Sequence, residues 1–195
     1  MTLAKTVRAI ILSIATAAAA PAANPQVTAT FSIVAYDAET QEWGIGVASR
    51  VLAVGYIVPW AEAGVGAIAT QALAKIDYGP DGLALLREGL SAEEVLAQLL
   101  AADEGREQRQ VAVVDAAGNV VAFTGAETFA WSGHRTGPAY SVQGNILVGE
   151  EVLSEMERAY VQTEGPLARR LVEALKAGEA AGGDKRGKES AALLV

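Results

Sequence analysis

Thr30 is the residue whose type and position could do the most chemistry. The triplet Val27-Thr28-Ala29 directly before it fits the small-x-small rule for signal-peptide cleavage. Cleavage after Ala29 would make Thr30 the first residue, with its hydroxyl beside its own α-amine. An α-amine has an ordinary pKa of about 7.7–8.0, so it can act as general base for that hydroxyl near neutral pH. A second site, after Ala22 in Ala20-Pro21-Ala22, fits the same rule and would leave Thr30 inside a strand.

The composition restricts the other nucleophiles and bases that the chain can use. Its 195 residues include no cysteine and one histidine, His134. A thiolate nucleophile and a disulfide are therefore excluded, as is a two-histidine metal site within one chain, and we expect no metal and no cofactor. A Ser–His–acid triad would have to use His134, and no spacing indicates one. The serines that it could use are Ser32, Ser49, Ser141 and Ser190.

Two further polar segments have the residue types of a binding or catalytic site. Gln143-Gly144-Asn145 places two side-chain amides around a glycine, which suits either an oxyanion hole or hydrogen bonding at a sheet edge. In the glycine-rich loop 182–187, Asp184 and Arg186 suit either an anion-binding nest that recognises a carboxylate or a solvated turn. The residues alone leave both alternatives open.

Charge and the N-terminal pattern indicate an exported protein. The net charge of −8 argues against binding to nucleic acid or to an anionic lipid surface. Lys5 and Arg8 precede the largely apolar run Ala9–Ala20, which is typical of a signal peptide and too short to span a bilayer. We expect a signal peptide over residues 1–22, or up to residue 29, and a secreted or periplasmic protein without membrane association after cleavage. A buried N-terminal helix is the alternative interpretation.

The elements that must position these residues are strands and paired helices. Runs rich in β-branched residues predict one hairpin over 27–37 and 43–49 and another over 110–115 and 120–124. Asp37 and Asp115 are expected to form the turns. A strand at 65–70 and helices from Pro80 to Gly89 and after the Ser91/Glu94 capping box follow. The remaining expected elements are a glycine-rich loop 128–138, an extended segment 139–148, helices 151–163 and 166–177, and a strand 190–195.

This order predicts a single α+β domain, residues 30–195, with antiparallel sheet layered against helices. The bare apolar strand at the end is an unusual natural terminus and is compatible with a C-terminal truncation.

Sequence blocks along most of the chain resemble those of an uncharacterised family, number one thousand and twenty-eight among the domains of unknown function. That family is placed in the Ntn (N-terminal nucleophile) hydrolase superfamily. The matching blocks are 30–35 with Asp37, 46–49, 58–67, 69–72, 78–80, 109–111, 113–115, 123–125, 133–134, 140–145 and 182–187.

The resemblance implies a four-layer αββα sandwich, in which two antiparallel sheets are covered by helices, and hydrolysis of a small-molecule or peptide amide by Thr30. On this view Asn145 and Gln143 assist catalysis, and the substrate-binding residues are Gln71, His134, Asp184 and Arg186. A homodimer through an exposed sheet edge is compatible with that fold. The opening is more distantly similar to proteasome β-type subunits, although the lysine that assists their threonine has no match between Lys5 and Lys75.

Three functions therefore compete. The first is an exported amide hydrolase of the N-terminal nucleophile type. The second is a non-catalytic exported module that binds a ligand or partner, favoured by the missing lysine and by cleavage after Ala22. The third is a serine hydrolase built around His134.

Overall fold

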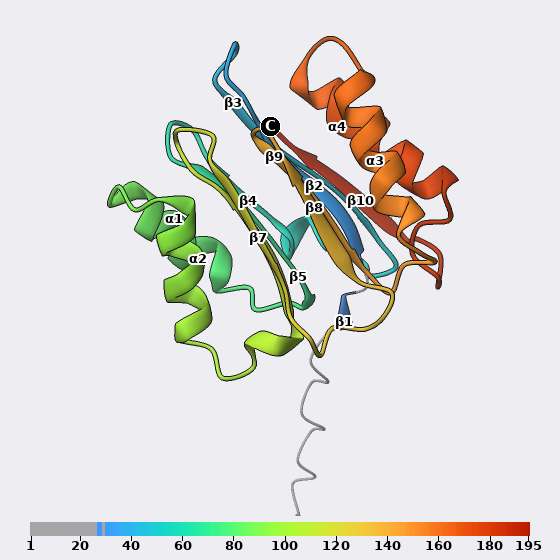
Figure 1. Cartoon of the computed structure of the whole chain (residues 1–195), viewed down its shortest axis with the longest axis horizontal. Coiled ribbons are helices and arrows are strands. Elements are labelled where there is room, and N and C mark those ends of the chain that lie inside the picture. Colours follow the sequence, from blue (N-terminus) through green and yellow to red (C-terminus); the bar gives the residue numbers. More distant parts are fainter. Residues whose placement is uncertain (1–26, 29) are drawn as a thin grey trace, which may run out of the picture.

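The computed structural model describes residues 27–28 and 30–195 (Figure 1). The predicted signal peptide, residues 1–22, and Ala29 of the second cleavage motif lie outside these residues. Within the described part of the chain, no helix is both long and apolar enough to cross a membrane.

Two antiparallel sheets form the centre of the molecule. The β2 sheet has the strand order β10-β3-β2-β9-β8. Its strands are β2 (Thr30–Asp37), β3 (Glu42–Ser49), β8 (Gly133–Gly137), β9 (Tyr140–Asn145) and β10 (Ser190–Leu194). The β5 sheet has the order β1-β5-β6-β7, with β4 also paired to β5. Its strands are β1 (Val27–Thr28), β4 (Pro59–Glu62), β5 (Gly66–Leu73), β6 (Arg109–Val114) and β7 (Val120–Thr124).

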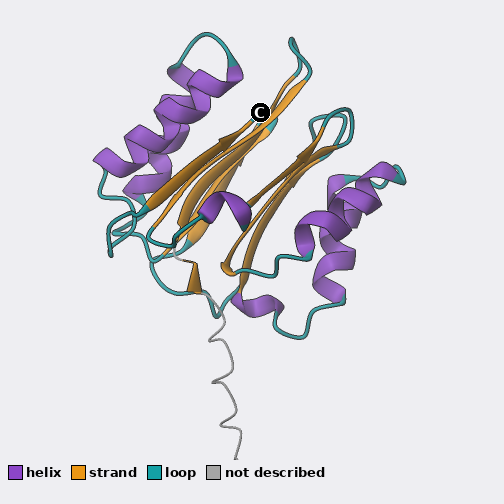
Figure 2. Cartoon of the chain, turned by 180° about the vertical axis from the view of Figure 1, so that it is seen from behind, coloured by secondary structure: helices purple, strands orange, loops and turns teal. Residues whose placement is uncertain are grey.

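A pair of helices covers the outer face of each sheet, as Figure 2 shows. Helices α1 (Tyr78–Arg87) and α2 (Ala92–Ala101) pack on the β5 sheet, where Ile68 and Val111 are fully buried. Helices α3 (Glu151–Gln162) and α4 (Leu167–Ala180) pack on the β2 sheet over Phe31 and Ile33. The mixed α+β architecture expected from the sequence, with two antiparallel sheets and helices, is confirmed.

The space between the sheets has an apolar half and a polar half. Because successive strand side chains point to opposite faces, Thr30, Ser32 and Val34 share the inner face of β2. Val34 belongs to an apolar cluster that includes Ile45 of β3 and Ala112 of β6. Thr30 and Ser32 lie at the other end, where fully buried polar residues replace the apolar ones. The core between the sheets therefore ends at a polar cluster around the start of β2.

Short sequence patterns predicted two turns and one helix start correctly. The Asp37 carboxylate accepts a hydrogen bond from the Glu39 amide at 2.9 Å, as expected for a turn former. Asp115 accepts bonds from the amides of Ala117 and Asn119, both at 2.9 Å. The capping box at the start of α2 is present as well.

Two strand expectations were wrong. The run 27–37 is not one strand, because β1 pairs with β5 while β2 pairs with β3 and β9. The segment 128–138 is not wholly loop, because β8 pairs with β9, and His134 therefore lies on a strand. Since β8 is an edge strand with a glycine at each end, its sequence lacks the apolar alternation that marks a half-buried strand.

Asp103 gives this fold a pH-dependent contribution to stability. Burial opposes ionisation of Asp103, but hydrogen bonds from Arg109 Nε (2.9 Å), Tyr78 Oη (2.9 Å) and the Gly105 amide (3.0 Å) outweigh it and lower its pKa to about 2. A lowered pKa stabilises the folded state above the unfolded value, 3.8, and this contribution disappears as the pH falls towards 2. The full contribution is about 2 kcal/mol.

We therefore expect Asp103→Asn to lower the free energy of unfolding at pH 6 by more than at pH 3. Urea unfolding of both proteins at the two pH values measures this difference. An equal loss at both values would show that the ionised carboxylate of Asp103 is not the stabilising form.

Candidate functional site

Thr30 begins the central strand of the β2 sheet and is fully buried. In the register of the sheet it lies opposite Ser49 of β3 and Asn145 of β9. Its hydroxyl donates a hydrogen bond to Ser49 Oγ at 3.2 Å. The strands on both sides thus fix the backbone of Thr30, and Ser49 of β3 orients its hydroxyl.

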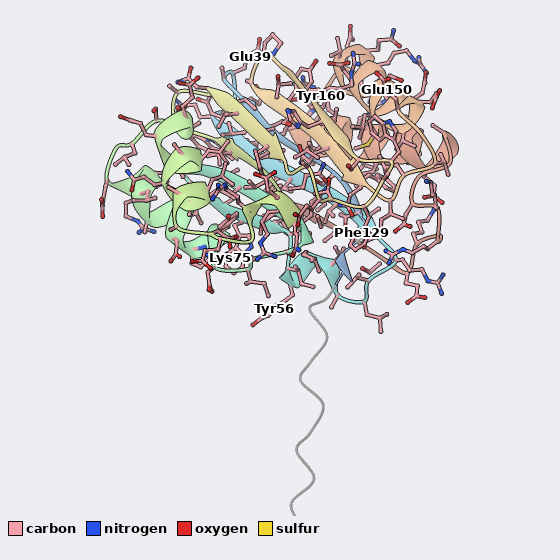
Figure 3. All side chains as sticks on the ribbon, turned by 60° about the horizontal axis from the view of Figure 1, so that its bottom comes forward. Glu39, Tyr56, Lys75, Phe129, Glu150 and Tyr160 are labelled. Atoms are coloured by element: carbon pink, nitrogen blue, oxygen red, sulfur yellow. The ribbon has the colours of Figure 1, made fainter. Side chains whose placement is uncertain are left out.

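The chain changes sheets immediately before Thr30. Val27 and Thr28 of β1 pair with Leu73 and Ala72 of β5, whereas Thr30 already belongs to the other sheet. One residue joins the two sheets at this end of the molecule. Figure 3 turns this end of the molecule, at which Tyr56, Lys75 and Phe129 are labelled, towards the viewer.

Gln71 and Gln110, here called the glutamine pair, connect the two sheets beside Thr30. The side chains lie opposite each other on β5 and β6, and Gln71 Nε2 donates to Gln110 Oε1 at 2.7 Å. Gln71 Nε2 also lies 3.5 Å from the backbone oxygen of Thr30, and Gln71 Oε1 accepts from Ser32 Oγ at 2.6 Å. The structure therefore brings Gln71, predicted to bind substrate, next to Thr30.

Gln110 is a residue that the sequence reasoning missed. Its Nε2 lies 2.9 Å from each of three acceptors, Thr124 Oγ1, the Gly133 oxygen and the Gly144 oxygen. A signal for it exists in the sequence, because Gln110 occupies an inner-face position directly before the wholly apolar run 111–114. That position is unfavourable for an amide unless other polar groups meet it there.

Gln143 lies in the same polar cluster but faces Ser32 rather than Thr30. Its Nε2 donates to Ser32 Oγ at 2.7 Å, and its Oε1 accepts from Ser141 Oγ at 2.7 Å. With both ends of the amide bonded inside an interior strand, Gln143 holds Ser32 in place. The sheet-edge alternative for residues 143–145 does not apply, since β9 lies between β2 and β8.

Asn145 differs from the other amides of the cluster because one of its polar atoms has no partner. Its Nδ2 donates to Gln110 Oε1 at 3.2 Å, whereas Oδ1 is buried without a hydrogen bond among the described residues. An unsatisfied buried acceptor costs about 1–3 kcal/mol and calls for an explanation. Because Asn145 lies opposite Thr30, a donor at the start of β2 would satisfy it.

His134 reaches the cluster indirectly. Its Nδ1 lies 2.9 Å from Thr124 Oγ1, which also accepts a hydrogen bond from Gln110 Nε2. The Thr124 hydroxyl is then free to donate its own proton to Nδ1, which assigns the remaining imidazole proton to Nε2. Desolvation of the ring lowers the pKa of His134, so the neutral form dominates near pH 7. Its hydrogen-bond partner in the described chain is a threonine, not one of the four candidate serines.

Asp184 and Arg186 form an ion pair next to Arg50, the residue that follows Ser49 of β3. Arg186 Nη2 lies 3.0 Å from Asp184 Oδ2, and the Asp184 side chain is fully buried. The backbone amide of Arg50 also donates to Asp184, at 3.4 Å. The loop 182–187 is therefore not merely a solvated turn, because Asp184 fixes it to the chain that follows β3. In the described residues, no group of three or more acidic or histidine side chains is placed to hold a metal ion.

Comparison with protein families settles the family membership. Residues 30–195 match the model described as "Family of unknown function (DUF1028)". The chain belongs to this family. A protein of the same family from Silicibacter pomeroyi, known from its crystal structure, is 37% identical and has a TM-score of 0.80, over 85% of this chain and 72% of that one. A comparison with curated proteins gives no match. The match thus establishes the family, whose description gives no function.

Proposed function

We propose that this member of the family is an amide hydrolase of the N-terminal nucleophile type, in which Thr30 becomes the first residue of an exported protein. The observation that carries the proposal is the environment of Thr30. It begins a buried central strand, its hydroxyl is held by Ser49, and the chain before it departs into the other sheet. As part of the same proposal, we assign the arrangement of helices and sheets to the αββα sandwich of the Ntn hydrolase superfamily.

In the proposed reaction the free α-amine of Thr30 takes the proton of its hydroxyl while Oγ1 attacks the substrate carbonyl carbon. Collapse of the tetrahedral intermediate breaks the amide bond, and the leaving amine receives the proton from the α-ammonium group. Water then attacks the resulting ester, with the same amine as base, and releases the acid. The reaction is balanced without a metal, a cofactor or His134.

The geometry favours a positioning role for Asn145. Its unpartnered Oδ1 is an acceptor opposite Thr30, and a liberated α-ammonium group is a strong donor. We assign Asn145 Oδ1 to hold the amine. Gln143, predicted to act with Asn145 in catalysis, is instead assigned to hold Ser32, because both ends of its amide are already bonded.

Asn145→Asp tests this role through the pH profile. A carboxylate beside the amine would stabilise its protonated form and raise the pKa of the amine, so the rise of kcat/KM with pH should move upward by about one unit. Gln143→Glu is the control, because it places a carboxylate beside Ser32 and should move the profile less. An unchanged profile in Asn145→Asp, with activity retained, would separate Asn145 from the amine.

The proposal as a whole is tested by the N-terminus and by covalent labelling. The full chain, produced with export, should yield a protein whose intact mass and N-terminal sequence begin at Thr30. A β-lactone should then add one acyl group, which peptide mapping places on Thr30. A mature chain that begins at Ala23, is not trimmed further and does not react would contradict the proposal. That result would favour the non-catalytic binding module.

A binding module has one observation in its favour. An apolar groove of about 630 Å³ runs between α4 and β10, lined in part by Phe31, Leu175 and Ala192. It lies on the outer side of the β2 sheet, away from the polar cluster, and would suit a small apolar ligand. Binding of such a ligand that is unaffected by changes at Thr30 would support this second function.

A further inference from the structure

The backbone around the Gln110 carboxamide allows it only one of its two orientations. Its Nε2 lies 2.9 Å from the backbone oxygens of Gly133 and Gly144, and backbone oxygens accept hydrogen bonds but cannot donate them. A carboxamide turned end for end would place its own oxygen against these two oxygens in a buried site, which is costly. The backbone of β8 and β9 therefore directs Gln110 Oε1 into the polar cluster.

Gln110 Oε1 in turn fixes the orientation of two neighbouring carboxamides. It accepts hydrogen bonds from Gln71 Nε2 at 2.7 Å and from Asn145 Nδ2 at 3.2 Å. If either neighbour were turned round, its oxygen would meet Gln110 Oε1, and neither oxygen could donate. The nitrogen of each neighbour thus points at Gln110, and its oxygen points elsewhere.

The two oxygens that point away from Gln110 differ in their partners. Gln71 Oε1 accepts from Ser32 Oγ at 2.6 Å, whereas Asn145 Oδ1 is buried with no partner in the described chain. In the register of the sheet, Asn145 lies opposite Thr30. The chain of bonded amides therefore ends in an open acceptor beside the start of β2, where a buried polar atom calls for a donor.

We propose that Gln110 is the positioning residue that turns the carboxamide oxygen of Asn145, rather than its nitrogen, towards the α-amine of Thr30. The inference rests on the proposed function, in which Asn145 Oδ1 holds that amine. An oxygen beside the amine stabilises its protonated form, whereas an NH2 group would stabilise its neutral form. Through Asn145, Gln110 thus sets the pH at which the amine becomes a base.

Gln110→Met tests this role in protein that begins at Thr30. Methionine has a similar length but no acceptor, so the Asn145 carboxamide becomes free to turn its NH2 group towards the neutral amine. The rise with pH in the rate of β-lactone labelling at Thr30 should then move downward by at least about 0.5 unit. This direction is opposite to that expected for Asn145→Asp. In an Asn145→Ala background, which has no carboxamide to turn, Gln110→Met should move the midpoint by less than about 0.2 unit.

Thr124→Val is the matched control. It removes one acceptor of Gln110 Nε2, at 2.9 Å, but keeps the oxygens of Gly133 and Gly144 that fix the orientation. The midpoint should therefore stay at that of the unchanged protein. The ionisable groups on the elements around Thr30 are His134 on β8, Arg50 after β3, Arg109 on β6, Lys75 after β5 and the charged residues of the loop 182–187. None of them is replaced in these variants, so a moved midpoint reports on the carboxamide.

A measurement in the unchanged protein does not depend on whether Gln110→Met folds. From residue 30 onward, asparagine occurs only at positions 119 and 145, so ¹⁵N labelling of asparagine yields side-chain NH2 signals from these two residues. Asn145 Nδ2 and Gln71 Nε2 donate to the same oxygen, so their protons should show a nuclear Overhauser effect when glutamine is labelled as well. Asn119 is the internal reference, for which no such effect is expected.

Two results would overturn this inference and leave the proposed function standing. One is an unmoved midpoint in folded Gln110→Met with the lactone still on Thr30, because a merely structural role would lower the rate without moving the midpoint. The other is the absence of the effect between the Asn145 and Gln71 amides, because Asn145 would then be turned the other way. Failure of the lactone to label Thr30 in the unchanged protein would overturn both proposals.

Discussion

Thr30→Ala, in protein that begins at residue 30, is expected to lower the rates of amide cleavage and β-lactone labelling by at least about 10³-fold. Removal of a nucleophile leaves only the catalysis that binding and oriented dipoles supply, and losses of this size or larger are typical. Thr30→Ser keeps a hydroxyl beside the α-amine and should retain activity within about tenfold. Turnover of a fluorogenic peptide with the residue 26–29 sequence, together with the mass of the lactone adduct, measures both rates.

Ser49→Ala is the matched control for Thr30→Ala. It removes the partner of the Thr30 hydroxyl, at 3.2 Å, but leaves the nucleophile and the amine in place. A partial loss is expected there, with the adduct still on Thr30. If Thr30→Ala retained the adduct and His134→Ala abolished it, the nucleophile would be a serine that His134 activates.

Gln110→Leu is expected to lower the free energy of unfolding by about 4 kcal/mol. Gln71 Nε2 and Asn145 Nδ2 would lose their acceptor, and the backbone oxygens of Gly133 and Gly144 would lose a donor. Each buried group left without a partner costs about 1–3 kcal/mol, and these groups lie too close together for their losses to add fully. Urea unfolding followed by circular dichroism measures the change.

Gln98→Leu provides the comparison on the surface. Gln98 is exposed on α2, so the same replacement there should change the free energy of unfolding by less than about 0.5 kcal/mol. A similar small change in Gln110→Leu would mean that water or a rearranged amide replaces Gln110, and that the glutamine pair does not hold the two sheets together.

The parts of the fold that depend on residues close together in the sequence were predictable from the sequence. The turn at Asp115 and the capping box at Ser91 each satisfy backbone groups within four positions along the chain, so a short pattern carries the whole signal. The strand β8 was not predicted, because its pairing with β9 satisfies a backbone whose own sequence has no apolar alternation.

The candidate site was predictable only in part, for the same reason. Thr30 could be singled out because the cleavage motif lies directly before it. Gln110 carries only the indirect signal of an amide at an inner-face position, since its partners Thr124 and Gly144 lie 14 and 34 positions away and meet it only after both sheets have formed. Arg50, whose backbone amide donates to Asp184, is even more distant, at 134 positions. For this reason the sequence of the loop 182–187 was also compatible with a solvated turn.

The change of sheet directly before Thr30 has a consequence for the timing of maturation. Thr28 is paired in one sheet and Thr30 in the other, so the bond between residues 29 and 30 reaches its place only when the sheets have packed against each other. If the bond is cut by a protease that needs the packed geometry, rather than by the signal peptidase whose rule the Val27-Thr28-Ala29 triplet fits, cleavage would occur only in molecules that have completed folding. A free α-amine on Thr30 would then be found only on folded molecules. Chains that fail to fold would keep the leader, and the nitrogen of Thr30 would stay in a peptide bond.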